Sequence, residues 1–137
     1  MNRIVIALAL ALLSFPASAA TVIHNDHGGV IREYAARFAA IGHRHERLVI
    51  DGACMSACTM ALSVPGMCVT PRAMFGFHAA RENPAYNAPI SAAGTAYLMA
   101  HYPSTVRRWI ASRGGLGRGL LILQGRELAG MAKMCPR

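Results

Sequence analysis

The amino-acid sequence predicts a single α/β domain that follows an N-terminal export signal. Short apolar and β-branched runs alternate with segments of helical periodicity in the first half of the chain, and helical segments fill the second half. No internal repeat or low-complexity segment divides the chain. Strands that alternate with helices favour a parallel sheet with right-handed crossovers. We therefore expect residues 20–137 to form one domain, with a βαβ core and a helical C-terminal half.

The first 19 residues have the three parts of a secretory signal. Arg3 supplies the positive start, residues 4–13 form an apolar run too short to span a bilayer, and Ala17-Ser18-Ala19 fits a signal peptidase site. We predict cleavage after Ala19. The mature protein would then be periplasmic or secreted, with no stable membrane insertion after signal removal. A retained membrane anchor is the alternative.

Short strands and amphipathic helices are predicted in turn over the first half of the domain. Apolar residues recur at helical spacing over 29–41, and Gly42 follows them as a helix-ending residue. Residues 52–56 are expected to form a tight connection. The predicted strands cover 21–24, 47–51, 67–70 and 73–77, and the predicted helices cover 29–41 and 57–63.

The second half begins with a long loop over residues 79–91, which contains two prolines and two asparagines. Helices are predicted beyond it over 92–101, 104–113 and 125–134. Ser104 follows a proline and is placed to cap the second of these helices.

Basic residues outnumber acidic ones in this chain. It has 14 Lys and Arg against 6 Asp and Glu, and one of the 14, Arg3, lies in the predicted signal. The arginines are spread along the chain, and aromatic residues do not alternate with them as a base-stacking surface requires. We therefore expect a solvated positive surface and no nucleic-acid partner, and we expect no cofactor.

Four cysteines occur in this expected export product: Cys54, Cys58, Cys68 and Cys135. An even count in that setting predicts two disulfides, and four cysteines allow three pairings. We favour Cys58 with Cys68 and Cys54 with Cys135, the second of which would tie the C-terminal tail to the centre of the domain. The alternative is a zinc site that uses Cys54, Cys58 and a histidine, but no second close pair of ligands follows, so no metal is expected.

Three local features have the residue types that chemistry needs. Gly28-Gly29 stands between a predicted strand and helix, where backbone N–H groups favour a developing oxyanion. Ser56 opens a helix at the end of a strand, as a nucleophile would. His78 ends an apolar strand beside the loop, as a general base would. The structural alternatives are a plain tight turn for the glycines, a helix N-cap for Ser56 and a structural role for His78.

The order of these features, Gly-Gly then Ser then His, puts each at the carboxyl end of a predicted strand, where sites form in open α/β sheets. The segments HGGVIREY, VIDGACMSACTMAL and CVTPRAMFGFHAA resemble the ClpP/crotonase superfamily, and most closely the exported, largely uncharacterised ClpP-like proteins of bacteria. The resemblance covers residues 22–80 and continues more faintly beyond. It implies a small ClpP/crotonase-like βαβ core.

The resemblance also implies a serine hydrolase or peptidase that acts on a peptide or a small acyl substrate through an acyl-enzyme. Ser56 would be the nucleophile and His78 the base, and the backbone N–H groups of Gly29 and Ala57 would form the oxyanion hole. Relatives commonly form homo-oligomers, and the resemblance leaves that open for this chain. The crotonase branch uses such an oxyanion hole on coenzyme A esters, which an exported protein would rarely meet.

The sequence departs from this family in the third catalytic residue. Clp proteolytic subunits place an acid after the histidine, but no Asp or Glu occurs between Glu82 and Glu127, and Glu127 falls slightly late. Asp51 or Asp26 would have to substitute, or a Ser-His dyad would act more slowly because nothing fixes the histidine tautomer. The alternatives are a catalytically inactive ClpP-like binding protein of the cell envelope and a structural protein stabilised by disulfides or zinc.

Overall fold

The computed structural model describes residues 19–136, so the predicted signal lies outside the described part of the chain except for Ala19. The strands are β1 (Ala20–Asp26), β2 (Arg47–Met55), β3 (Cys68–Val69), β4 (Met74–Phe77) and β5 (Leu121–Gln124). The helices are α1 (Ile31–His43), the 3₁₀ helix η1 (Ser56–Ser63), α2 (Ala92–His101), α3 (Ser104–Ser112) and α4 (Gly125–Ala129). The chain has the mixed α/β fold that the sequence predicts.

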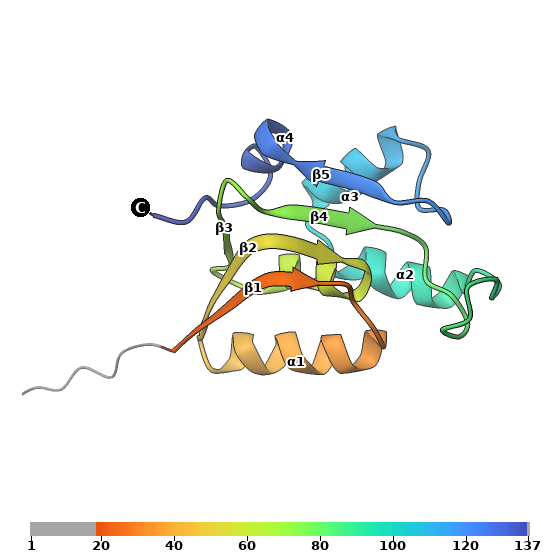
Figure 1. The fold of residues 1–137 in the computed structure, drawn as a ribbon, viewed down its shortest axis with the longest axis horizontal. Coiled ribbons are helices and arrows are strands. Elements are labelled where there is room, and N and C mark those ends of the chain that lie inside the picture. The colour runs from red at the N-terminus through yellow and green to blue at the C-terminus, as the bar shows by residue number, and fades with distance from the viewer. Residues whose placement is uncertain (1–18, 137) are drawn as a thin grey trace, which may run out of the picture.

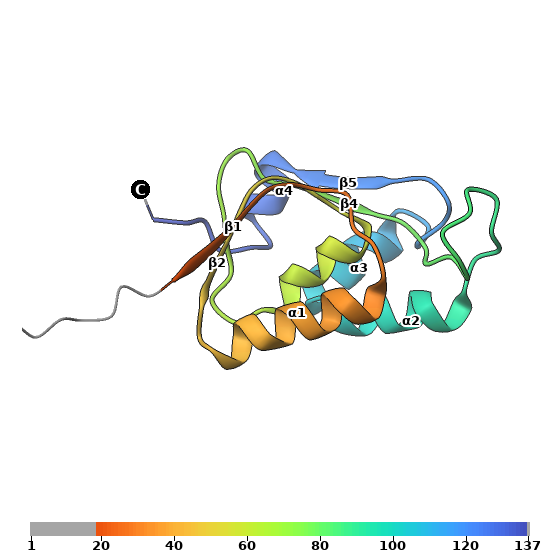
Figure 2. The ribbon, with the colours of Figure 1, turned by 60° about the horizontal axis from the view of Figure 1, so that its bottom comes forward.

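The sheet is mainly parallel and is covered on one face by helices. Its order is β1-β2-β4-β5, with β1 and β4 parallel to β2 and with β5 antiparallel to β4. The short strand β3 pairs with Val49 and Ile50 of β2, and β4 pairs with β2 further along, at residues 53–55. Helices α1, η1, α2 and α3 all lie on the same side of the sheet (Figure 2). The carboxyl ends of β1, β2 and β4 meet at one edge, on the right in Figure 1.

Two parts of the strand prediction are wrong. The tight connection expected over 52–56 is instead the end of β2, which continues to Met55 through a bulge opposite β1. A Cβ at Gly52 would lie 2.0 Å from the carbonyl oxygen of His24, so only glycine fits at this bulge. The C-terminal half is not entirely helical, because β5 forms an edge of the sheet. A strand of four residues has too little periodicity to be separated from a short helix in sequence.

The helices of the second half follow the prediction unevenly. Helix α2 covers the predicted residues 92–101, and the Ser91 hydroxyl accepts a hydrogen bond from the N–H of Gly94 at its start. Ser104 does not cap α3, since Pro103 occupies the cap position and Ser104 is already helical. Helix α4 ends at Ala129, five residues before the predicted end at 134. Within residues 19–136, no helix is long and apolar enough to cross a membrane.

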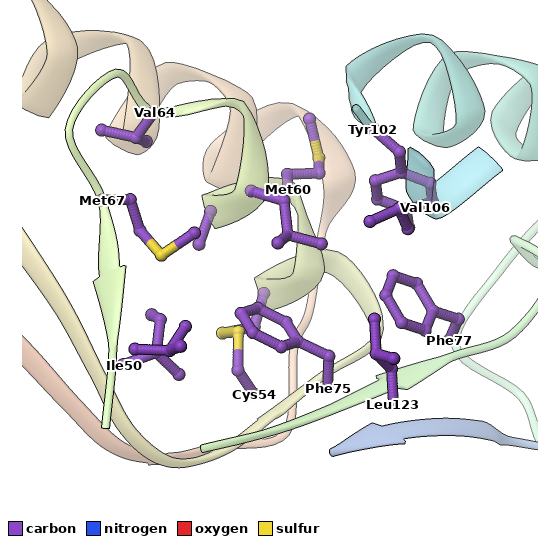
Figure 3. Close-up of a cluster of buried hydrophobic side chains, with 14 of the residues drawn as sticks. Ile50, Cys54, Met60, Val64, Met67, Phe75, Phe77, Tyr102, Val106 and Leu123 are labelled. Atoms are coloured by element: carbon purple, nitrogen blue, oxygen red, sulfur yellow. A yellow bond between two sulfur atoms is a disulfide. The ribbon is translucent and has the colours of Figure 1, made fainter. Parts of the chain in front are cut away.

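The hydrophobic core lies between the sheet and η1 (Figure 3). Phe75 and Phe77 of β4 and Leu123 of β5 are fully buried and belong to one cluster with Met60 of η1 and Val106 of α3. Burying a side chain of this kind stabilises the fold by about 1.5–3 kcal/mol. This packing fixes η1, and therefore the turn at its N-terminus, against the sheet.

Both disulfides form, but the pairing that we favoured is wrong. Cys54 is joined to Cys58, with Cα atoms 5.2 Å apart, and Cys68 is joined to Cys135, with Cα atoms 4.9 Å apart. The first turn of η1 brings Cys58 back over the end of β2, and the C-terminal tail runs alongside β3. The disulfide between Cys54 and Cys58 takes both cysteines of the alternative zinc site.

Candidate functional site

Three turns meet at the carboxyl edge of the parallel strands. Gly28 and Gly29 follow β1, Ser56 follows β2 and His78 follows β4. These four residues line one pocket of about 490 Å³, which the start of α1 and the loop after β4 complete. The structure therefore brings together the Gly-Gly turn, the serine and the histidine that stand out in the sequence.

Ser56 has a strained backbone. Its φ is +57°, in the left-handed region that costs L-residues about 1–2 kcal/mol, at the point where β2 ends and η1 begins. The Thr59 hydroxyl donates to the carbonyl oxygen of Ser56. Since its proton is used there, Thr59 accepts from the Tyr102 hydroxyl, 2.7 Å away. Burial raises the pKa of Tyr102 to about 12. The two hydrogen bonds through Thr59 connect the Ser56 turn to the core.

Gly28 lies so close to the Ser56 turn that no side chain fits there. A Cβ on Gly28 would lie 2.6 Å from the Cβ of Ser56 and 2.8 Å from the backbone nitrogen of Ala57. The φ of Gly28 is +80°, which also favours glycine. The turn after β1 and the turn after β2 are therefore in direct contact.

Asp26 fixes the Gly-Gly turn, a role that the sequence analysis missed. Its Oδ1 accepts hydrogen bonds from the N–H of Gly28 at 2.8 Å and from the hydroxyl of Tyr34 at 2.6 Å, and Arg37 donates to Oδ2 at 3.2 Å. Burial, and then the hydrogen bond to Asp26, raise the pKa of Tyr34 to about 12. Tyr34 and Arg37 are three residues apart on α1, and this spacing on one helix face was the available signal.

The N–H groups of Gly29 and Ala57 are the two that the resemblance assigns to the oxyanion hole. Gly29 stands just before α1, and Ala57 is the second residue of η1. Ala57 lies in the first turn of η1, where N–H groups have no partner within the helix, whereas Gly29 precedes Val30, the N-cap residue of α1. The N–H of Gly28 is already bound to Asp26, so Gly29 is the donor that the Gly-Gly turn has left.

The imidazole of His78 is held by a backbone carbonyl. Its Nδ1 lies 2.7 Å from the carbonyl oxygen of Ala79. A carbonyl oxygen only accepts, so Nδ1 carries the proton and donates, and Nε2 is left as an acceptor. The N–H of Ala80, which lies in the same peptide plane as this carbonyl, donates to the Thr95 hydroxyl at 3.0 Å and so helps to fix the carbonyl's orientation.

None of the three acids considered from the sequence contacts this imidazole. Asp26 is bound to the Gly-Gly turn. Asp51 is hydrogen-bonded to Arg72, which is the main cause that lowers the pKa of this carboxyl to about 2. Glu127 forms an ion pair with Arg113 at 2.6 Å. The partner of His78 Nδ1 is therefore a backbone carbonyl, and not any of these three carboxylates.

Ser56 and His78 share the pocket without a direct hydrogen bond between their side chains in the described part of the chain. Glu82 also lines the pocket, and it makes no hydrogen bond to His78 among residues 19–136. In structures without substrate, catalytic hydrogen bonds are often long and tighten only when substrate is bound.

Thr59 and Tyr102 are the support residues that sequence reasoning missed completely. They are 43 positions apart, and their hydrogen bond forms only once α2 is placed over η1. Thr59 is the one fully buried polar side chain in the core of the described residues. A threonine three residues after the candidate nucleophile was the only local signal, because side-chain hydrogen bonds to a carbonyl three residues earlier are common.

Comparison of the chain with protein-family models, with curated proteins and with solved structures gave no match. The pocket itself is therefore the basis for a functional assignment.

Proposed function

We propose that the protein is an exported serine hydrolase that cleaves an amide or ester through an acyl-enzyme on Ser56. The observation that carries the proposal is the strained, left-handed backbone of Ser56 at a strand-to-helix turn, in the pocket that also contains His78. Strained residues persist only where their surroundings over-determine them, and they cluster at functional sites. A serine on such a turn presents its hydroxyl above the end of the sheet.

In the proposed reaction, Ser56 Oγ attacks the substrate carbonyl carbon and its proton moves to His78 Nε2. The N–H groups of Gly29 and Ala57 bind the negative oxygen that forms, and donors of this kind are worth about 3–4 kcal/mol each. The C–N or C–O bond then breaks, and His78 gives the proton to the leaving group. Water, with His78 as base, hydrolyses the ester on Ser56 and restores the free serine.

The carbonyl of Ala79 supplies part of what an acid would supply. It holds His78 in the tautomer that leaves Nε2 free, which removes the main defect of an unsupported histidine. It is neutral, so it stabilises the imidazolium less than a carboxylate does. We expect acylation to be slower than with a full triad, and faster than with the wrong tautomer, which costs about 10⁴ in kcat.

A ClpP-like core and a location outside the cytoplasm belong to the same proposal. The Gly-Gly, Ser and His turns follow β1, β2 and β4, three parallel strands that are neighbours in the sheet, and this supports the relationship. Two disulfides support an oxidising compartment, because disulfides are rare in the cytoplasm.

The test is covalent labelling with a fluorophosphonate, followed by mass spectrometry of the labelled peptide. We expect label on Ser56, no label in Ser56→Ala, and a rate lower by about 10²–10⁴ in His78→Ala, the usual contribution of a general base. Ser63→Ala is the matched control, since Ser63 ends the same helix and its hydroxyl only donates to Met60. Folded wild-type protein that takes no label, or label that survives in Ser56→Ala, would contradict the proposal.

A second candidate is a non-catalytic binding protein of the same fold. The observation that favours it is the neutral partner of His78, since no described carboxylate holds the imidazole. This candidate predicts that folded protein binds peptides in the pocket, yet takes no fluorophosphonate and turns over no activated ester.

A further inference from the structure

A second pocket also has His78 in its lining. It has a volume of about 390 Å³, and its lining includes Arg81 and Arg118 beside Tyr86 and Asn87. His78 and Arg81 also line the pocket that contains Ser56. The two pockets are therefore neighbours that share His78 and Arg81.

A flap, which we define as residues 82–89, contributes to the lining of both pockets. Its base is closed by a bridge between Arg81 and Ile90 and by a hydrogen bond from the N–H of Glu82 to Pro89. The flap protrudes between β4 and α2 at the edge of the molecule (Figure 2). Its first residues, 82–84, line the Ser56 pocket, whereas residues 86 and 87 line the second pocket.

The second pocket is positively charged. Each of its two arginines donates hydrogen bonds from Nη1 to backbone carbonyl oxygens of the flap. Arg81 donates to the carbonyls of Ala85 and Tyr86 at 3.3 Å, and Arg118 donates to the carbonyl of Ala88 at 3.1 Å. No carboxylate lines this pocket, and neither arginine forms an ion pair within residues 19–136. The flap thus holds two guanidinium groups in place while their remaining N–H groups are left for a ligand.

We propose that the second pocket binds a carboxylate on the leaving-group side of the substrate. This inference rests on the proposed function, in which His78 gives its proton to the leaving amine. The acyl part must contact Ser56 and the Gly-Gly turn, and both lie in the first pocket. The departing part therefore lies past His78, where Arg81 and Arg118 bind an anion with charge-assisted hydrogen bonds.

The substrate class that fits is a peptide whose first residue after the cut carries a carboxylate. That carboxylate is either the free C-terminal α-carboxylate or the side chain of an acidic residue, and both present the same chemistry to the arginines. In either case the peptide C–N bond breaks, the acyl carbon bonds to Ser56 Oγ, and the Ser56 proton leaves on the amine by way of His78.

Binding to the disulfide-bonded Ser56→Ala protein tests this without need of turnover. The probes are acetyl-Ala-Ala-Gly with a free carboxylate, the same peptide with a C-terminal amide, and acetyl-Ala-Ala-Glu amide, titrated by calorimetry. We expect the free carboxylate or the Glu peptide, or both, to bind about tenfold tighter than the Gly amide, the size of one charged hydrogen-bonded pair. Whichever of the two binds tighter identifies the source of the carboxylate.

Arginine variants locate the preference. On the Ser56→Ala background, Arg81→Gln and Arg118→Gln should each reduce it, and Arg118→Lys should keep most of it because the charge remains. Arg126→Gln is the matched control, since it removes the same charge from the exposed helix α4. A preference that is lost in Arg118→Gln and kept in Arg118→Lys cannot come from unfolding of the flap.

Equal binding of all three peptides would overturn the inference, and so would a preference that both Gln variants keep. The proposed function is tested by a separate measurement, the fluorophosphonate labelling of the wild type. If Ser56 is labelled but the carboxylate peptides bind no tighter, the hydrolase proposal stands and the proposed carboxylate site is wrong. If the carboxylate peptides bind tighter but Ser56 is not labelled, the second pocket binds anions and the hydrolase proposal is wrong.

Discussion

The disulfide between Cys54 and Cys58 spans 4 positions of sequence, whereas the disulfide between Cys68 and Cys135 spans 67. The first, the elbow disulfide, encloses Ser56 at the carboxyl edge of the sheet. The second, the anchor disulfide, ties the C-terminal tail to β3 at the opposite end of the sheet (Figure 1). One region is thus built around a strained turn and an open pocket, and the other around a chain end that is fastened to the core.

Loop length separates what the two cross-links do. In the chain-entropy description, a disulfide stabilises by restricting the unfolded chain, and the effect grows with the logarithm of the loop. This gives about 4 kcal/mol for the anchor disulfide and about 2 kcal/mol for the elbow disulfide. The anchor disulfide therefore mainly stabilises the fold, and the elbow disulfide has its larger consequence in the shape of the Ser56 turn.

The largest expected effect is on stability when the anchor is cut. The double variant Cys68→Ala with Cys135→Ala should lose about 4 kcal/mol of unfolding free energy in urea titrations. Fluorophosphonate labelling of the fraction that stays folded should change little, since the anchor is far from the pocket. A loss below about 1 kcal/mol would mean that the tail contacts hold the chain end without the cross-link.

Alanine substitution of two glycines, one in each region, tests the difference between the elbow region and the anchor region. Gly28 and Gly66 both have positive φ, at +80° and +77°, but a Cβ on Gly66 meets nothing within 4 Å. Gly66→Ala should cost only the conformational penalty of about 1–2 kcal/mol. Gly28→Ala adds a clash with the Ser56 turn, so it should cost about 3 kcal/mol and abolish labelling.

The comparison of these variants isolates the contact between the two turns. Unfolding free energies and labelling rates are measured for both on the same preparation. Equal losses in the two variants, with labelling retained in Gly28→Ala, would show that the Gly-Gly turn does not support Ser56.

Removal of the elbow disulfide should affect stability less, and labelling more, than removal of the anchor disulfide. The double variant Cys54→Ala with Cys58→Ala should lose only about 2 kcal/mol. Its labelling rate should fall by about tenfold, because a turn that relaxes by about 1.4 kcal/mol away from the reactive geometry loses that factor. Labelling that is slowed equally in both disulfide variants would remove the distinction between the regions.

The sequence was informative where the signal is local. The β-branched and apolar runs located β1, β2 and β4, and the Gly-Gly, Ser and His segments were expected at the ends of these strands and lie there. It failed where the answer depends on tertiary pairing. Which cysteines approach one another is set by the turn of η1 and by the path of the tail, and β5 exists because β4 offers an edge to pair with.

The same distinction holds within the site. Sequence reasoning looked for an acid behind His78, because the resemblance led there. A backbone carbonyl cannot be read from residue type, so the contact between His78 and Ala79 was invisible. The support of Ser56 by Thr59 and Tyr102 depends on α2 lying over η1, which no spacing in the sequence encodes.

The smallest expected effect is a loss of stability that occurs only at acidic pH and that arises in the region of the anchor disulfide. Asp51 lies beside β3, where Thr70 and Arg72 donate hydrogen bonds to it, and the Arg72 guanidinium is the chief cause that lowers its pKa to about 2. An aspartate in the unfolded chain has a pKa of about 3.9. A carboxyl with a lowered folded pKa adds stability above the unfolded value, and this contribution is lost as pH falls towards the folded pKa.

Wild-type protein should therefore lose stability between about pH 4 and pH 2 more steeply than Asp51→Asn, which is less stable at pH 7 but has no such group to titrate. Urea titrations at a series of pH values measure the slopes, and the carboxyl carbon shift of Asp51 in NMR gives the pKa directly. Arg72→Gln should move that pKa up towards its usual range and reduce the same slope. Identical acid slopes in the wild type and Asp51→Asn would contradict the prediction, because the acid sensitivity would then not come from Asp51.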